Sequence, residues 1–281
     1  MSRLYETLRR MEMQGGKADP IQIATQRPLE VVNRVTVEPS EMEVGPSAKV
    51  TVTPQSRLVA LSDPRGLAAE KFRALVTRLE HLRKERHLQS VQIASAVSHE
   101  GKTLVSGNLA VTLAKHTGSR VLAVEGDLHL PELASLFGLR QLPGIGDWWS
   151  ARLDKEMISQ FVHRLNEIPL WILSAGAVTE QPSQILQSAR FAEMFVRLVS
   201  WFDWVVVDST PILPLVDANL WSRIVDGTLM VVREGVTPVR ALRKCFDSLD
   251  DPRLIGVVLN EASEFDRTSY ADQYYGLYHR K

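Results

Sequence analysis

The sequence predicts an α/β fold with a doubly wound, mostly parallel sheet. Short runs that are apolar throughout alternate along the chain with helical stretches, as expected for strands buried on both faces by covering helices. The chain has 281 residues, 44% of them hydrophobic, which suffices for a large core and an additional arm. Strands are expected at Val91–Ala94, Arg120–Val124, Leu170–Leu173, Trp204–Val207, Thr228–Val232 and Ile255–Leu259.

The first 57 residues are predicted to be a flexible arm. Residues 3–11 fit a short amphipathic helix, suited to docking on a partner. Between Tyr5 and Phe72 the chain holds no Phe, Trp or Tyr, and residues 17–57 are rich in Val, Thr, Pro and Glu. A segment without large apolar anchors does not repay its ordering entropy. The start of the chain lacks the apolar region of a signal peptide, and we expect an intracellular protein.

The predicted helices follow from apolar residues at helical spacing. From Ala68 to Leu82 apolar residues recur every three or four positions, which predicts a long helix after Pro64. Further helices are expected at Leu104–His116 and Ser183–Ser200. The single cysteine, Cys245, cannot form an intrachain disulfide, and we expect a small apolar residue on a helix.

A phosphate-binding turn is predicted between the first strand and its helix. Residues 96–103 read Ala-Val-Ser-His-Glu-Gly-Lys-Thr and fit the Walker A pattern G-x-x-x-x-G-K-[ST], with Ala at the first glycine position. Backbone N–H groups and a helix N-terminus favour phosphate there. Lys102 would reach the β- and γ-phosphates of ATP, and the Thr103 hydroxyl would bind Mg²⁺. The residues expected to contact the nucleotide are Ser98, His99, Glu100, Gly101, Lys102, Thr103 and Leu104.

Two other predicted strands lead into carboxylates. Glu125 and Asp127 are expected just past the end of one strand, and Asp208 just past the end of another. Ligands of an open α/β sheet bind outside the carboxyl ends of its strands. Any one of these acids alone is as well explained by a helix cap or a solvated loop. Together, beside a phosphate turn, they are predicted to bind Mg²⁺ with Thr103.

Tyrosine is concentrated at the C-terminus. One tyrosine is Tyr5, and the others are Tyr270, Tyr274, Tyr275 and Tyr278. Tyrosine is ordinarily spread through cores and half-buried surfaces. Residues 263–281 are therefore either a segment that docks by aromatic packing or a functional tail.

The order of these motifs resembles the bacterial tyrosine kinases of capsule and exopolysaccharide export, from about Leu58 to the C-terminus. Several of the motifs are shared with the partition and septum-site ATPases, and the tyrosine cluster favours the kinase branch. Beyond the Walker A turn, the resemblance is carried by the segments 121–131, 131–139, 143–147, 182–186, 204–211, 225–233 and 256–260.

The resemblance implies a P-loop kinase domain over residues 58–262 and a tyrosine tail over 263–281. It implies a transferase that moves the γ-phosphate of ATP, with Mg²⁺, to its own tyrosines Tyr270, Tyr274, Tyr275 and Tyr278. Asp127 would orient the attacking hydroxyl, Lys102 and Asp208 would complete the catalytic group, and Asn260 would lie near the base. Catalysis of this kind is mostly positioning and charge neutralisation.

The resemblance also implies partners and a location. A cytoplasmic homo-oligomer would be recruited to the inner face of the cell membrane by a separate chain, a polysaccharide co-polymerase that regulates chain length. The balance of 33 basic and 33 acidic residues gives no reason to expect nucleic-acid binding, and no apolar run is long enough for a direct membrane span.

The chain departs from the family pattern at several positions. Glu125 replaces the usual Asp and is one methylene longer, and His129 replaces an Arg, so a fixed charge becomes a titratable one. Asp208 is followed by Ser-Thr-Pro instead of Thr-Pro-Pro. The oligomerisation pattern E-x-x-R-x-x-R keeps Glu70 and Arg73 and loses its last Arg. These departures bear on catalytic rate and assembly rather than on nucleotide binding.

Two other functions remain open on the sequence alone. One is an ATPase switch of the partition type, although that class usually has a second lysine early in the turn, where this chain has Ala96, Val97 and Ser98. The other is a catalytically weak adaptor that binds nucleotide within the export machinery, which the changes at Glu125 and His129 favour.

Overall fold

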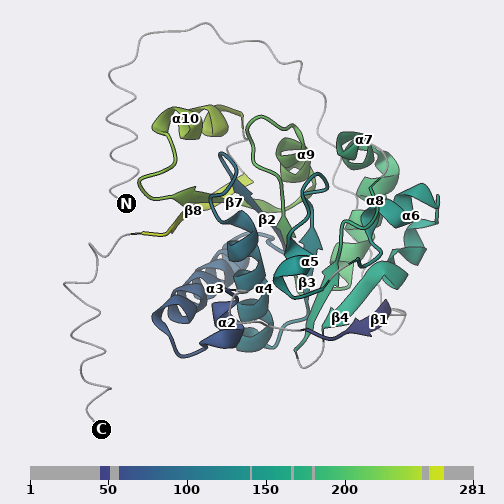
Figure 1. The fold of residues 1–281 in the computed structure, drawn as a ribbon, viewed down its shortest axis with the longest axis horizontal. Helices are drawn as coiled ribbons and strands as arrows, with labels where there is room; N and C mark the ends of the chain where they lie inside the picture. Colours follow the sequence, from purple (N-terminus) through teal and green to yellow (C-terminus); the bar gives the residue numbers. More distant parts are fainter. Residues whose placement is uncertain are drawn as a thin grey trace, which may run out of the picture. The chain divides into compact units, whose positions relative to one another are not determined.

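One sheet of eight strands, in the order β1-β4-β5-β3-β6-β2-β7-β8, organises the part of the chain that the computed structural model describes (Figure 1). The described residues are 45–50, 57–139, 141–165, 168–178, 181–248 and 253–262, all within the unit Val35–Lys281. The strands are β1 (Gly45–Ala48), β2 (Ser90–Ser95), β3 (Val121–Glu125), β4 (Val162–Leu165), β5 (Leu170–Leu173), β6 (Trp204–Asp208), β7 (Gly227–Arg233) and β8 (Leu254–Asn260).

The predicted doubly wound, mostly parallel sheet is confirmed. Every neighbouring pair of strands is parallel except β4 and β5. The strand β6 lies between β2 and β3, and the pairing register sets both Ile93 and Glu125 opposite Asp208. The three strands therefore end at nearly the same level, which brings the turn after β2 and the carboxylates of β3 and β6 to one edge of the sheet.

Each predicted strand is present to within one residue at either end, and two strands were not predicted. The prediction that Glu125 and Asp208 follow their strands is wrong by one residue, because the two residues still pair with each other as the last of β3 and β6. The strands β1 and β4 pair with each other at one end of the sheet. Gly45–Ala48 lies inside the predicted arm, and it joins the sheet through backbone pairing that requires no large side chain.

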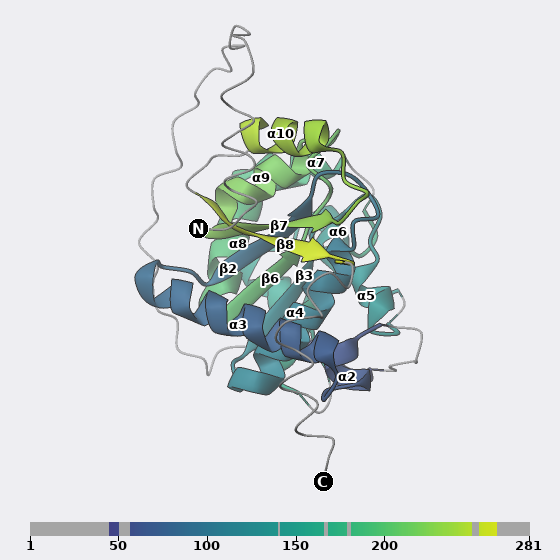
Figure 2. The ribbon, with the colours of Figure 1, turned by 90° about the vertical axis from the view of Figure 1, so that its left-hand side faces the viewer.

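Helices cover both faces of the sheet, as Figure 2 shows. The helices α3 (Leu67–Glu85) and α4 (Lys102–Thr117) pack on one face, in a core that includes Val76, Leu109 and Val206. The helices α8 (Ala189–Ser200), α9 (Asp217–Ile224) and α10 (Val239–Ser248) cover the other face. Shorter helices are α2 (Val59–Ser62), α5 (Leu133–Leu136), α6 (Ile145–Ser150), the 3₁₀ helix η3 (Lys155–Phe161) and α7 (Pro182–Gln187).

The predicted helices are confirmed with one correction. The stretch Ser183–Ser200 is divided into α7 and α8 by Ser188, which has extended backbone. The Ser188 side chain accepts a hydrogen bond of 3.1 Å from the backbone N–H of Phe191 and so caps α8. Cys245 is buried on α10 as predicted, and burial raises the pKa of its thiol to about 11.

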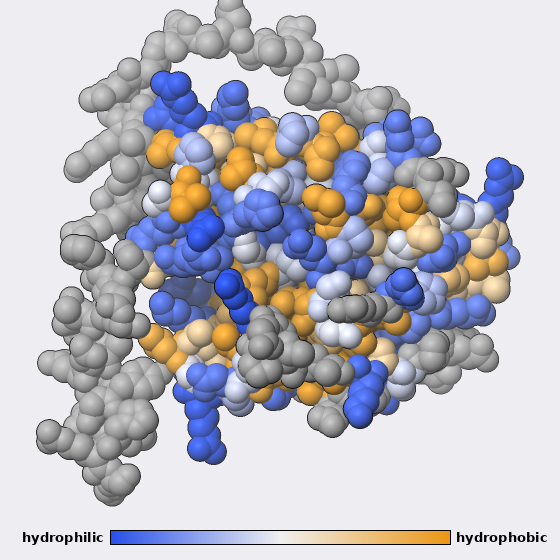
Figure 3. All heavy atoms as spheres, in the orientation of Figure 1, coloured by the Kyte–Doolittle hydropathy of each residue, from blue (hydrophilic) through white to orange (hydrophobic). Residues whose placement is uncertain are grey.

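The surface shows no dominance of one kind of side chain on the face drawn in Figure 3, where small hydrophobic groups alternate with hydrophilic ones. Among the described helices, none combines the length and the apolar character that crossing a membrane requires. The predicted helix at residues 3–11 and the predicted tail at residues 263–281 lie outside the described residues.

Candidate active site

A tight turn joins β2 to α4 and carries the predicted phosphate-binding motif. Two of its residues have left-handed backbone, His99 with φ 63° and Gly101 with φ 91°. Such a turn can direct successive N–H groups to one side, where they bind an anion. A Cβ at position 101 would lie 2.2 Å from Nδ2 of Asn260, so backbone angle and space both require glycine. The predicted strand–turn–helix setting is present.

Glu100 supports this turn from inside. Its side chain is 1% exposed, and its Oε2 accepts hydrogen bonds from the backbone N–H groups of Ala96, at 2.8 Å, and Val97, at 3.2 Å. Its Oε1 accepts from the hydroxyl of Thr237 in the loop before α10. Both carboxylate oxygens of Glu100 are thus engaged in hydrogen bonds within the protein, so only the backbone of Glu100 is available to bind a phosphate. Ser98 and His99 are exposed.

Asn260 lies against the same turn. Its side-chain amide donates a 2.8 Å hydrogen bond to the carbonyl oxygen of Glu100 from the end of β8. Leu104, the last residue of the predicted nucleotide set, is half-buried in the first turn of α4. Asn260 therefore holds the turn in place, while its predicted closeness to the base stays a prediction.

Lys102 and Asp127 form an ion pair at the start of α4. Nζ of Lys102 lies 3.0 Å from Oδ2 of Asp127, with only 12% and 5% of the two side chains exposed. Oδ1 of Asp127 accepts from the backbone N–H groups of His129 and Leu130. Burial lowers the pKa of Lys102, but the carboxylates of Asp208, Asp127 and Glu132 raise it further, so the pKa lies above its ordinary value. Lys102 is therefore held positive.

Asp208 is fully buried at the end of β6, beside Lys102. Its Oδ1 is hydrogen-bonded to the Ser106 hydroxyl at 3.1 Å, and its Oδ2 is buried without a hydrogen-bond partner among the described residues. Burial raises the pKa of Asp208 to about 6, although Lys102 and the hydroxyls of Thr103 and Ser106 act in the opposite direction. The carboxylate thus has charge and hydrogen-bonding capacity that the described residues do not satisfy.

These groups fit a magnesium ion. The unsatisfied oxygen of Asp208 and the nearby hydroxyl of Thr103 are the hard oxygen donors that Mg²⁺ prefers. No three His, Cys, Asp or Glu side chains form a metal cluster in the described part of the chain. The lack of such a cluster is compatible with Mg²⁺, because Mg²⁺ commonly binds one or two carboxylates and completes its coordination with water and phosphate oxygens.

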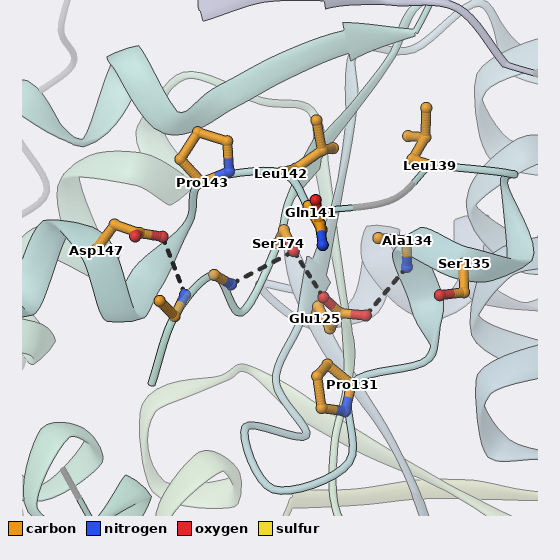
Figure 4. Close-up of a pocket in the computed structure, with 12 residues that line it drawn as sticks. Glu125, Pro131, Ala134, Ser135, Leu139, Gln141, Leu142, Pro143, Asp147 and Ser174 are labelled. Carbon is orange, nitrogen blue, oxygen red and sulfur yellow. Dashed lines mark hydrogen bonds between the residues drawn. The ribbon is translucent and has the colours of Figure 1, made fainter. Parts of the chain in front are cut away.

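Glu125 is separated from this group by its hydrogen bonds. Its Oε1 accepts from the backbone N–H of Ala134 at 3.0 Å. Its Oε2 accepts from the hydroxyl of Ser174 at 2.8 Å and from the N–H of Ala175 at 3.0 Å. Figure 4 shows the carboxylate between α5 and the end of β5. Among the described residues it makes no hydrogen bond or ion pair with the Lys102 group, so the geometry favours Thr103 and Asp208 as metal ligands, with Asp127 paired to Lys102 beside them.

Comparison with known proteins identifies the family. No protein-family model matches the chain. The tyrosine-protein kinase YwqD of Bacillus subtilis is 30% identical over 224 residues, which cover 79% of this chain and 92% of that protein. This chain belongs to the bacterial tyrosine kinases. The putative tyrosine-protein kinase CapB of Staphylococcus aureus is 28% identical over 81% of this chain and 97% of that protein, and the kinase wzc of Salmonella typhi matches over 30% of its own length.

Solved structures support the same fold for this kinase. The chimerical protein CapA2B2 has a TM-score of 0.69 at 23% identity, covering 80% of this chain and 97% of that one. The cell-division ATPase MinD of Pyrococcus furiosus has a TM-score of 0.53 at 24% identity, covering 64% of this chain and 74% of that one. The predicted relation to the septum-site ATPases is confirmed at the level of fold. The predicted enzyme class, a tyrosine kinase of the capsule and exopolysaccharide group, is confirmed by the family, and the kinase binds nucleotide.

His129 ties the loop after β3 to α9. Its Nε2 lies 2.8 Å from Oδ2 of Asp217, whose side chain is 2% exposed at the first position of α9. The backbone N–H of His129 also contacts Asp127. His129, which the resemblance aligns with an Arg of the family, is therefore a partner for this buried carboxylate.

Sequence reasoning missed several residues around the site. Ser106 was signalled by its spacing, since it lies one helical turn after Lys102 and reaches Asp208. Thr237, Ser174 and Asp217 had no such signal. Each contacts its partner across at least 49 positions of the chain, and no local pattern encodes that contact.

Proposed function

We propose that this chain transfers the γ-phosphoryl group of ATP, with Mg²⁺, to tyrosine hydroxyls in its own C-terminal segment, and that it thereby regulates the synthesis and export of capsule or exopolysaccharide. The observation that carries the proposal is the group of Lys102, Asp127 and Asp208 at the phosphate-binding turn. This group supplies one held positive charge, one carboxylate beside it and one buried carboxylate with an unsatisfied oxygen.

The residues of the chain have separate roles in this transfer. The N–H groups of the turn and the N-terminus of α4 bind the phosphates, and Lys102 neutralises charge on the group that moves. Thr103 and Asp208 would hold Mg²⁺, which supplies further neutralisation of the phosphate oxygens when bound. This proposal narrows the metal-binding set predicted from the sequence, which was Thr103, Glu125, Asp127 and Asp208. We assign Glu125 to the fold and Asp127 to the acceptor hydroxyl.

Asp127 orients the acceptor. A tyrosine phenol has a pKa of about 10 and is protonated at neutral pH, so a carboxylate beside its hydroxyl is useful. Without substrate, Asp127 is paired with Lys102. A phosphate on Lys102 would relieve that pairing and free an oxygen of Asp127. The phenol oxygen then bonds to the γ-phosphorus as the bond to the bridging oxygen breaks, ADP leaves, and the phenol proton passes to Asp127 and on to solvent.

The test is phosphotyrosine detection after incubation of the purified full chain with ATP and Mg²⁺. Wild type is expected to label itself, and Lys102→Ala is expected to lose both label and nucleotide affinity. Lys115→Ala is the matched control, because Lys115 is an exposed lysine near the other end of α4. Asp127→Asn is expected to lose label and keep much of its nucleotide binding. Absence of label from wild type, with a partner's cytoplasmic segment present, would overturn the kinase proposal.

One observation favours the alternative that this chain is a catalytically weak adaptor. Glu125, at the position of a family carboxylate, has both of its oxygens engaged in the fold. A nucleotide-binding adaptor would keep Mg²⁺-dependent ATP binding and give no phosphotyrosine in the same assay, so the two functions are separated by one measurement.

Assembly and location belong to the same proposal. We expect a homo-oligomer recruited to the inner face of the cell membrane by a separate chain-length regulator. The support is that one relative, 29% identical over 28% of its own length, is named a succinoglycan biosynthesis transport protein. Co-purification of the full chain with such a regulator, lost when residues 1–44 are removed and β1 is kept, would support a contact through the predicted arm.

A further inference from the structure

A second hollow lies beside the phosphate site, and we call it the Glu125 pocket. It opens between the end of β3, the helix α5 and the end of β5, and its volume is about 410 Å³ (Figure 4). Pro131, Leu139 and Leu142 supply apolar walls. Glu125 and Asp147 supply carboxylates, and no Lys, Arg or His lines the pocket within the described residues.

The two carboxylates give the pocket a negative character. The Oδ2 of Asp147 accepts from the N–H groups of Gly144, at 2.9 Å, and Ala177, at 3.1 Å. Its Oδ1 accepts no hydrogen bond from the described residues and remains available to a ligand. Among the described residues that line the pocket, the walls are apolar with two carboxylates and no cation, which suits an uncharged or basic side chain. They disfavour a carboxylate or a phosphate, because like charges brought together in a partly desolvated site repel.

The pocket adjoins the site of phosphoryl transfer. Glu125 lines the pocket and lies two residues before Asp127. Pro131 in its wall precedes Glu132, whose charge acts on Lys102. A tyrosine whose hydroxyl reaches Asp127 would therefore bring its neighbours in the sequence to the mouth of this pocket.

We propose that the Glu125 pocket receives a side chain within two residues of the acceptor tyrosine in the tail of this chain, that it accepts uncharged and basic side chains, and that it rejects acidic and phosphorylated ones. This rests on the proposed kinase function. The pocket then ranks the tail tyrosines. Tyr278 has Leu277 and Arg280 within two residues, whereas Tyr270 and Tyr274 each have Asp272 at that distance. Tyr275 and Tyr278 have no acidic residue within two positions and are the favoured acceptors, and phosphate on Tyr275 disfavours Tyr274.

The test measures the share of phosphate on each tyrosine by mass spectrometry in the full chain at early times after addition of ATP and Mg²⁺. Wild type is expected to label Tyr278 ahead of Tyr270. Ser135→Lys adds a cation to the pocket from an exposed position of α5, and the ratio of label on Tyr278 to label on Tyr270 is expected to fall about fivefold. Gln187→Lys, exposed on α7 and outside the pocket lining, is the matched control and should leave the ratio unchanged.

A second variant acts on the tail and leaves the pocket intact. Asp272→Lys is expected to raise the share of label on Tyr270 in the wild-type background and to lose that effect in combination with Ser135→Lys. A general loss of activity lowers the label on every tyrosine equally and leaves the ratio unchanged. The ratio therefore remains informative even for a slow variant. An unchanged ratio in Ser135→Lys together with an unchanged share in Asp272→Lys would overturn the pocket's role and leave the kinase standing. A wild-type chain without phosphotyrosine would remove both proposals.

Discussion

Without a bound cation, the negative charge of Asp208 is destabilising because it is buried. Its side chain is fully buried, one oxygen has no partner, and burial raises its pKa to about 6. A folded-state pKa above the unfolded value means that the folded protein holds the proton to higher pH. The stability that Asp208 contributes is therefore present below about pH 4 and is lost as the pH rises through about 6.

Replacement of this charge is predicted to stabilise the protein and disable the site. Asp208→Asn should raise the free energy of unfolding without nucleotide at neutral pH by up to about 3 kcal/mol, since one pKa unit corresponds to about 1.4 kcal/mol. It should also abolish Mg²⁺-dependent nucleotide binding. Denaturant unfolding measures the first effect and calorimetric titration the second. Asp203→Asn, at a half-exposed ion pair, is the control that should show neither. A less stable Asp208→Asn variant at neutral pH would contradict this account.

Glu125 is predicted to act as a tie between three elements. Glu125→Asp shortens the side chain by one methylene and withdraws it from Ala134, Ser174 and Ala175. Hydrogen bonds to a charged group contribute about 1.5–3 kcal/mol each, so we expect the free energy of unfolding to fall by at least about 2 kcal/mol. Thermal unfolding checks this, with Glu132→Asp, at an exposed position, as control. Unchanged stability with faster autophosphorylation would instead assign Glu125 to the reaction.

The break between α7 and α8 is an element-scale feature with a measurable energy. Ser188→Ala removes the hydroxyl that accepts from the N–H of Phe191 and should cost about 1 kcal/mol of stability, as for other N-caps. Chemical denaturation measures the loss, and phosphotyrosine labelling should stay unchanged, since Ser188 is not among the residues at the site. Ser183→Ala in α7 is the matched control. Equal stability of the two variants would mean that packing, and not the cap, sets the start of α8.

Elements that bury apolar runs were predictable from the sequence, and those held by backbone pairing were not. The strands β2, β3, β6 and β7 are buried throughout or nearly so, and uninterrupted apolar runs located them. The strand β1 pairs with β4 through its backbone, which no side-chain pattern announces. The same distinction holds at the site, where the Walker A spacing located Lys102 and Thr103. Two of the three hydrogen bonds that hold Glu125 away from the metal group, those to Ser174 and Ala175, join residues about 50 positions apart, which no local pattern encodes.

At the scale of the whole molecule, the proposed reaction requires that the tyrosines of residues 263–281 reach the site at Lys102. The strand β8 ends at Asn260, which is bonded to the phosphate-binding turn, and the first tail tyrosine, Tyr270, follows ten residues later. Ten residues span at most roughly 33–36 Å when extended. That reach would allow the tail to return to the site of its own chain. We expect transfer between chains because we propose that the protein is a homo-oligomer.

A mixing experiment tests transfer between chains. One variant, Lys102→Ala, keeps the tyrosines and lacks the proposed phosphate lysine. The other replaces Tyr270, Tyr274, Tyr275 and Tyr278 by Phe and keeps the site. Neither should label alone, and in the mixture the Lys102→Ala chain should become phosphorylated, because an intact site and an intact tail are then supplied by different copies. The tyrosine-free variant that also carries Lys102→Ala is the control and should restore nothing. If the mixture stays unlabelled while wild type labels itself at the tail, the tyrosines are modified within their own chain, and the exchange of tails between copies is wrong.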